Sequence, residues 1–136
     1  MAYTPTQENT ARADVRRSHQ SGRPGVKVVY DRGWREPINR IEESVRIAVI
    51  DEAHKLGVWA AVHTSRNEEI IAATAAGADT IEQGALEPLS QQAIDAMKDA
   101  DVTLIPTLAV IEGIAPKLLP TVQQNVRMAK AAGVQV

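Results

Sequence analysis

Four copies of one short pattern constrain the fold of this chain more than any other feature. Each copy ends a helix-like segment, turns, and starts a short hydrophobic run; the copies read KLGVWAAV, AAGADTIE, KDADVTLI and AAGVQV. Helices and strands that alternate in this way predict right-handed crossovers and a parallel sheet. Such a sheet belongs to either a (β/α)8 barrel or an open doubly wound fold. A whole barrel needs about 250 residues, so a chain of 136 residues can form only part of one.

The predicted strands are short and rich in β-branched residues. They lie near 26–30, 58–63, 79–83 and 102–107, and residues 134–136 begin a fifth strand. We expect these strands to pair in sequential order, with the helices packed on the outer face of the sheet. The predicted helices cover 11–20, 41–56, 68–76, 91–100 and 122–132, and a loop connects 107 to 121. The expected helix caps are Thr10, either Ser65 or Asn67, then Ser90 and Thr121.

Composition and charge exclude several classes of function. The formal net charge is -2 and no basic block occurs, which argues against nucleic acid as a partner. No apolar run approaches the roughly 18 residues of a membrane helix. The chain has no cysteine, so it contains neither disulfides nor thiolate metal sites, and we expect a cytoplasmic protein. No glycine-rich phosphate loop follows a predicted strand, which disfavours nucleotide-binding folds.

Domain organisation is predicted to be simple. Residues 1–10 are polar and lack periodicity, and we interpret them as a flexible tail. Residues 11–136 then form one α/β domain, as expected for a chain of this length.

Three side chains are candidates for chemistry. Lys27 interrupts the first predicted strand; it is either an edge residue that reaches water or an inward-pointing functional group. His63 ends the second predicted strand and is either a hydrogen-bonded core histidine or a metal ligand. His54, in the last turn of its helix, is interpreted as a surface or packing residue. Strand alternation is expected to place Trp59, Ala61 and His63 on the same face of the sheet as Asp79, Ile81 and Gln83.

Three segments together resemble a known family. They are VRIAVIDEAHKLGVWAAVHTSRNEEIIAATAAGADTIEQG, LSQQAIDAMKDADVTLIPTLAV and NVRMAKAAGVQV. Their order and spacing are similar to those of the metal-dependent amidohydrolase superfamily, closest to its imidazolonepropionase- and prolidase-like branch. The resemblance covers about residues 22–136 and implies strands four to eight of a (β/α)8 barrel.

The resemblance also implies a site. His63 matches the histidine metal ligand of strand five, and Gln83 takes the place of the strand-six histidine in the family pattern Ile-Glu-His-Gly. Lys27 lies near the strand-four lysine that many members carbamylate to bridge two metals. The His-x-His of strand one has no counterpart in this chain, and the strand-eight aspartate would lie beyond Val136. The implied cofactor is zinc, but the ligand set within the chain is incomplete.

The implied function is hydrolysis of amide, cyclic amide or peptide C–N bonds in a small-molecule substrate. Most of the family's ligands and its catalytic aspartate are missing, so we expect the chain to be incomplete or inactive alone. The alternative is a non-catalytic binding or assembly module that retains the fold. We further expect a homo-oligomer or pairing with a complementary barrel portion, because the sheet would expose its edges and a largely aliphatic inner face. A competing expectation is that residues 1–22 fold back over that face.

Overall fold

A single parallel sheet with helices along one face organises the computed structural model, which describes residues 5–32 and 40–136. The strands are β1 (Gly25–Val29), β2 (Trp59–His63), β3 (Thr80–Glu82) and β4 (Thr103–Ile105). They pair in parallel in the order β1-β2-β3-β4. The predicted parallel, sequential sheet is therefore confirmed.

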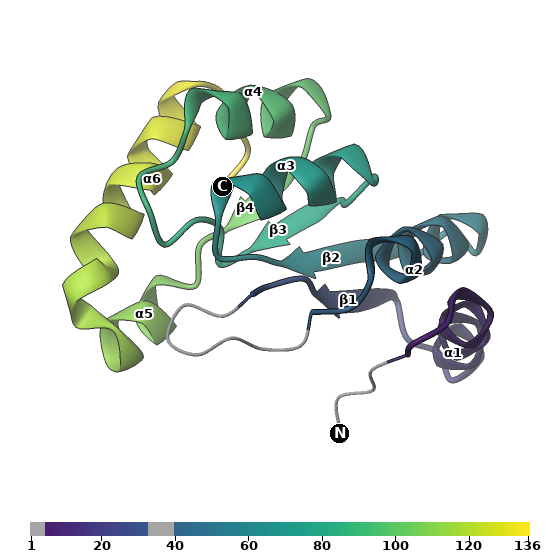
Figure 1. Cartoon of the computed structure of the whole chain (residues 1–136). Coiled ribbons are helices and arrows are strands. Elements are labelled where there is room, and N and C mark those ends of the chain that lie inside the picture. The colour runs from purple at the N-terminus through teal and green to yellow at the C-terminus, as the bar shows by residue number, and fades with distance from the viewer. Residues whose placement is uncertain (1–4, 33–39) are drawn as a thin grey trace.

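Helices connect the strands and cover one side of the sheet (Figure 1). They are α1 (Glu8–Gln20), α2 (Glu43–Lys55), α3 (Asn67–Ala75), α4 (Gln91–Asp99), α5 (Leu108–Ile114) and α6 (Leu119–Ala131), with a 3-10 turn η1 (Pro116–Leu118) before α6. The core lies between these helices and the side chains that point toward them from the strands: Val28, Val62, Ile81 and Leu104, each at most 5% exposed. No helix in the described parts of the chain is long and apolar enough to cross a membrane.

The other face of the sheet is open, and both apolar and polar side chains lie on it. In-register pairing places Val29, His63, Glu82 and Ile105 at one level of this face. The prediction of a largely aliphatic face is wrong, because strand alternation sends most of the aliphatic side chains toward the helices. The apolar members that remain exposed at this level are the end residues Val29 (48%) and Ile105 (41%).

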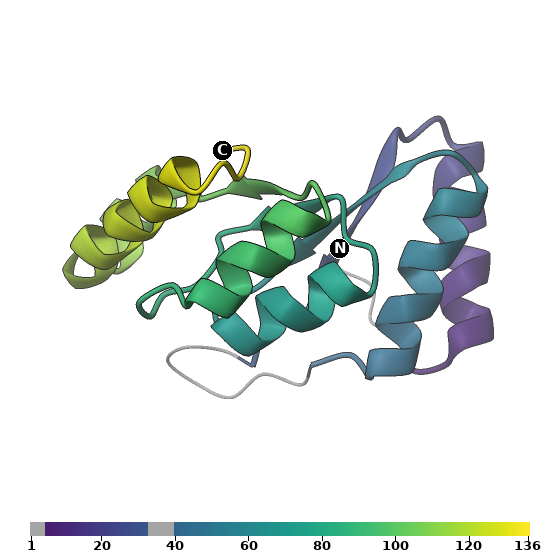
Figure 2. The same ribbon diagram turned by 90° about the horizontal axis from the view of Figure 1, so that it is seen from above.

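Helix α1 does not cover the open face, contrary to one expectation. It packs against α2 at the β1 end of the molecule, as Figure 2 shows. Arg12 and Arg16 of α1 pair there with Asp51 and Glu52 of α2. Because these ion pairs fix α1 beside α2, the open face stays uncovered by the described N-terminal residues.

Several predicted details of the helices and turns are corrected. α1 starts at Glu8 with Gln7 at the N-cap position, so Thr10 lies inside the helix and is not its cap. The expected loop before 121 contains α5 and η1, and α6 begins at Leu119 with Pro120 in its first turn. Proline is tolerated there because the first helical N–H groups have no partner within the helix. Thr121 is therefore helical, whereas Ser90 caps α4 as predicted by accepting from Ala93 N at 3.1 Å.

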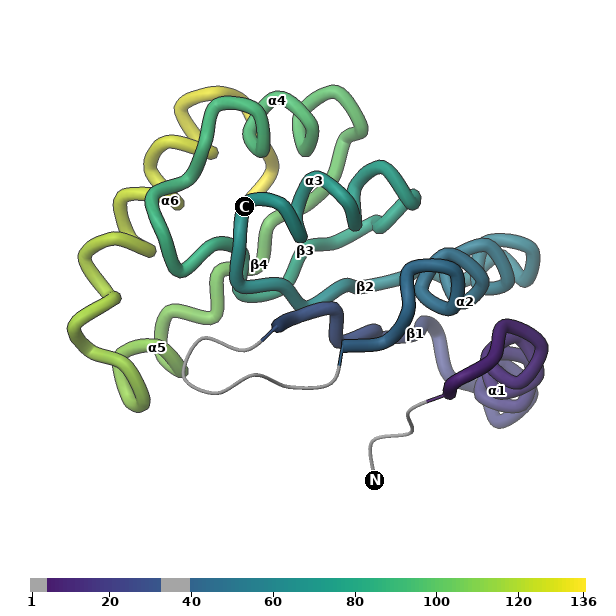
Figure 3. The backbone as a smooth tube through the Cα atoms, in the orientation of Figure 1, coloured from purple at the N-terminus to yellow at the C-terminus, as the bar shows by residue number. Residues whose placement is uncertain are grey.

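The C-terminal residues lie along β4 without forming the predicted fifth strand. Leu104 N donates to Gln135 O at 2.8 Å, and Thr103 Oγ1 bonds Gln135 Oε1 at 3.2 Å. The chain path in Figure 3 shows this yellow segment reaching the β4 side of the sheet. It thereby occupies the outer edge of β4 at one backbone position, while β1 is the opposite edge of the described sheet.

Candidate functional site

The carboxyl end of the sheet brings together side chains from neighbouring strands. His63 is the last residue of β2 and its side chain is 24% exposed. Glu82, the last residue of β3, pairs directly with His63 across the sheet. Lys27 of β1 lies on the same open face, and its Nζ forms an ion pair with the Glu82 carboxylate. The open face thus has a charged centre made by adjacent strands.

Gln83 does not share this row, which corrects the expected face assignment on β3. Ile81 is fully buried among the core residues under the helices, so Glu82 takes the position opposite His63. The predicted assignment of residues to the two faces is shifted by one residue on β3, because β3 pairs with β2 in a register that sets Thr80 beside Ala61. Gln83 follows the strand with a φ of 69° and is 7% exposed. Its Nε2 donates to Thr64 O at 3.5 Å, so its amide lies near the end of β2.

An acidic residue that the sequence analysis did not single out contacts His63. Asp31 follows β1 and is 5% exposed, and its Oδ2 lies 3.6 Å from His63 Nε2. Its other oxygen, Oδ1, accepts a hydrogen bond of 2.5 Å from Ser65 Oγ. The one available signal was its position directly after a strand, where parallel sheets present functional side chains.

Burial controls the protonation of His63. Desolvation lowers the pKa of the imidazole, and the positive charge of Lys27 lowers this pKa further. The carboxylates of Asp31, Glu82 and Glu69 oppose the shift without cancelling it. The resulting neutral imidazole is the form that can bind a metal or accept a proton.

A second buried carboxylate fixes the turn that follows His63. Glu69 is 0% exposed and accepts backbone N–H bonds from Arg32 and Ser65 at 2.9 Å and from Arg66 at 3.2 Å. Arg66 is the N-cap residue of α3, so neither Ser65 nor Asn67 caps this helix as predicted. Ser65 instead turns its hydroxyl to Asp31, and Asn67 Oδ1 accepts from Ser90 N at 2.9 Å.

The described residues do not fit a catalytic metal by themselves. A catalytic zinc usually takes three protein ligands and keeps one position open. Within residues 5–32 and 40–136, no group of three His, Asp or Glu side chains is placed to hold a metal ion. Lys27 is paired with Glu82, and the neutral amide of Gln83 is a weaker zinc ligand than imidazole. The metal-binding roles of His63, Lys27 and Gln83 therefore stay predictions.

Known structures contain the same arrangement of strands and helices as part of longer chains. A Xaa-Pro dipeptidase with bound methionine in its active site superposes with a TM-score of 0.80 at 24% identity, covering 94% of this chain and 36% of that chain. The A. niger ochratoxinase superposes with a TM-score of 0.83 at 19% identity, covering 96% of this chain and 34% of that chain. An amidohydrolase gives 0.74 at 19% identity, with 94% and 36% covered.

This chain has the fold of part of the barrel that these solved structures contain. The resemblance noted in the sequence is thus confirmed at the level of the fold, and the partial-barrel prediction with it. The chain spans only about a third of the length of these solved structures, and its sheet is not closed. No protein-family model and no curated protein sequence matches the chain.

Proposed function

We propose that this chain supplies one wall of a metal-dependent hydrolase site that cleaves amide-like C–N bonds. The observation that carries the proposal is the position of His63 in this fold. His63 is the last residue of β2, and its imidazole lies on the open face beside the buried carboxylate of Asp31. Solved structures that share the fold are a dipeptidase, an ochratoxinase and a molinate hydrolase. Barrel enzymes place their chemistry at this carboxyl end.

The chain would contribute binding and orientation, with the remaining ligands supplied by a complementary barrel portion. His63, together with the ligands of the complementary portion, would hold the metal, which would supply a water molecule of lowered pKa and polarisation of the scissile carbonyl. Within this chain, Asp31 restricts the imidazole of His63 from one side, and Ser65 holds Asp31. Zinc is the metal we propose on chemical grounds, since histidine nitrogens and Asp or Glu oxygens are among its usual protein ligands.

Zinc titration by calorimetry tests this proposal, because weak binding through one imidazole is measurable without turnover. We expect His63→Ala to weaken the zinc binding of the parent chain. The matched control is His54→Ala, which removes a 43% exposed histidine that pairs with Asp79 at 3.0 Å. This control should leave zinc binding unchanged. A zinc affinity that is unchanged in His63→Ala would contradict a role for His63 as a ligand.

A second candidate function is a non-catalytic binding or assembly module that keeps the fold. The observation that favours it is the ion pair between Lys27 and Glu82 at the centre of the open face. A lysine that is held in an ion pair is not free to be carbamylated and to bridge two metals. Metal analysis of the purified protein separates the two candidates. Zinc near stoichiometry supports the hydrolase site, and its absence together with no zinc response on titration supports the module.

For either function we propose a homo-oligomer or a complex with a complementary barrel portion, acting in the cytoplasm. Support for assembly comes from the uncovered face of the sheet and from β1 as an edge strand of the described sheet. An unpaired strand edge presents N–H and C=O groups that another chain can bond.

A further inference from the structure

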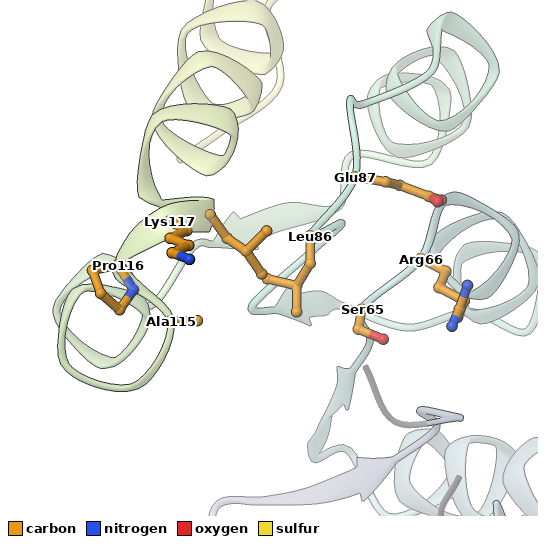
Figure 4. Close-up of a pocket in the computed structure, with 8 residues that line it drawn as sticks. Ser65, Arg66, Leu86, Glu87, Ala115, Pro116 and Lys117 are labelled. Atoms are coloured by element: carbon orange, nitrogen blue, oxygen red, sulfur yellow. The ribbon is translucent and has the colours of Figure 1, made fainter. Parts of the chain in front are cut away.

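A cleft of about 590 Å³ lies beside the candidate site and is lined by both polar and apolar residues. Three connections form it: the β2–α3 turn, the β3–α4 loop and the segment that joins α5 to α6. Its size falls in the range of small-molecule pockets, about 300–1,000 Å³. Figure 4 shows Ala115, Pro116 and Lys117 on one side, with Ser65, Arg66 and Glu87 across from them and Leu86 between.

Specific hydrogen bonds fix the walls of the cleft. Leu86 N donates to Ser65 O at 2.8 Å and so joins two of the connections. Asn125 of α6, 4% exposed, accepts from Leu89 N at 2.8 Å and donates to Ala85 O at 3.0 Å and Glu87 O at 2.8 Å. These bonds tie the β3–α4 loop to α6. The cleft is therefore formed before any ligand arrives, which reduces the entropic cost of binding.

The apolar side of the cleft is part of a small hydrophobic cluster. Leu86 (8% exposed) and Ala115 (5%) belong to the same cluster as Ile111 and Val122, and Leu118 packs against them. Pro116 extends this wall. An aliphatic group of a few carbons placed here would lose its contact with water without displacing a charged side chain, which favours binding through the hydrophobic effect.

The charged residues that line the cleft favour an anion. Lys117 is exposed, and among the described residues no ion pair is found for its ammonium group. Arg66 adds a second cationic side chain to the lining. The only acid of the lining, Glu87, already accepts from Asn67 N at 2.9 Å and Asn67 Nδ2 at 3.0 Å. The lining therefore has more positive than negative charge, and its acid is engaged.

We infer that this cleft binds an aliphatic carboxylate, with the carboxylate toward Lys117 and the chain on the Leu86–Ala115 wall. The inference extends the proposed function, on which its biological meaning rests, because hydrolysis of an amide bond releases a carboxylate. Ser65 links the two places: it lines the cleft and its hydroxyl holds Asp31, which lies next to His63. A free aliphatic acid and the C-terminus of a peptide share this chemistry.

NMR titration of the isotopically labelled chain with 4-methylpentanoate tests the inference without metal or turnover. We expect saturable shifts at the amides of Leu86, Ala115 and Leu118, and weaker or no shifts with 4-methylpentanamide, the neutral isostere. Titration with N-acetyl-glycyl-leucine distinguishes a peptide terminus from a free acid by which of the two binds more tightly. Equal affinity for acid and amide, or no saturable shift, would overturn the inference.

Charge reversal at one lysine provides the matched comparison. Lys117→Glu should weaken binding of 4-methylpentanoate by about tenfold or more. Lys130→Glu makes the same charge change on an exposed residue at the far end of α6 and should leave affinity nearly unchanged. Equal losses in the two variants would show a non-specific charge effect and refute the site. Because no zinc is present, failure here is separate from failure of the His63 zinc titration.

Discussion

Replacement of Glu69 by alanine should destabilise the fold strongly, because one buried carboxylate organises the turn after His63. The carboxylate accepts backbone N–H bonds from Arg32, Ser65 and Arg66. Each hydrogen bond to a charged group contributes about 1.5–3 kcal/mol, and a buried donor left without a partner costs about 1–3 kcal/mol. The Ser65 N–H is buried, whereas water can reach the other two donors in part.

We therefore expect Glu69→Ala to lower the free energy of unfolding by about 3–5 kcal/mol, a large share of the 5–15 kcal/mol typical of a domain. Urea denaturation followed by circular dichroism measures the change, and the midpoint should fall while the slope m stays the same. If Glu69→Ala does not fold, Glu69→Gln extends the test. Its remaining carbonyl oxygen can keep part of the network, so the expected loss is about half as large.

Glu68→Ala is the control, since it lies in the same turn of α3 and makes the same change in side chain. Glu68 is 59% exposed and its partner Arg32 lies at 3.4 Å, in an ion pair accessible to water. Such pairs contribute about 0–1 kcal/mol. If Glu69→Ala costs no more than Glu68→Ala, the buried carboxylate does not organise this turn and the reasoning is refuted.

Three further predictions concern the carboxyl end of the sheet and its open face. Lys27→Met should raise the pKa of His63, because the lysine charge is one cause that lowers it; an NMR titration of the imidazole that shows no rise would contradict this coupling. Since the folded-state pKa of His63 lies below its ordinary value, its contribution to stability is complete above pH 6.5 and is lost as pH falls through the folded pKa. Lys27→Met narrows the gap between the folded and unfolded pKa values, so the loss of stability should be smaller and should be complete at a higher pH. Gln83→His should raise zinc affinity in calorimetry, with Gln83→Asn as the control, and an unchanged affinity would show that Gln83 does not occupy a ligand position. Light scattering coupled to size exclusion should show an oligomer at micromolar concentration, and a monomer peak stable to dilution would contradict the proposed assembly.

Short-range patterns in the sequence were sufficient to predict the architecture. The turns before β2 and β3 carry their own signal: Gly57 and Gly77 have positive φ, where glycine is favoured over residues with a Cβ. Ser90 caps α4 through a bond to a residue three positions away. Such features depend on neighbouring residues, so one sequence is enough to predict them.

Register between strands could not be predicted in the same way. The alternation within β3 was visible, but which alternate set faces the helices depends on its pairing with β2, about twenty residues earlier in the chain. Ile81 is buried under the helices, so its neighbour Glu82 faces the open side and lies opposite His63. Because side chains alternate along a strand, the sequence is equally compatible with either alternate set facing the helices. Only packing distinguishes these two orientations of the strand.

The sequence by itself determined the alternation of strands and helices, the parallel order of the sheet and the position of His63 at the end of a strand. The tertiary structure decided which groups surround that histidine. Asp31 reaches Ser65 across 34 positions and Asn125 reaches Ala85 across 40. Contacts of this kind form when separate strand–helix units pack together, and their partners are selected by burial and hydrogen-bond geometry in three dimensions, which no local pattern encodes.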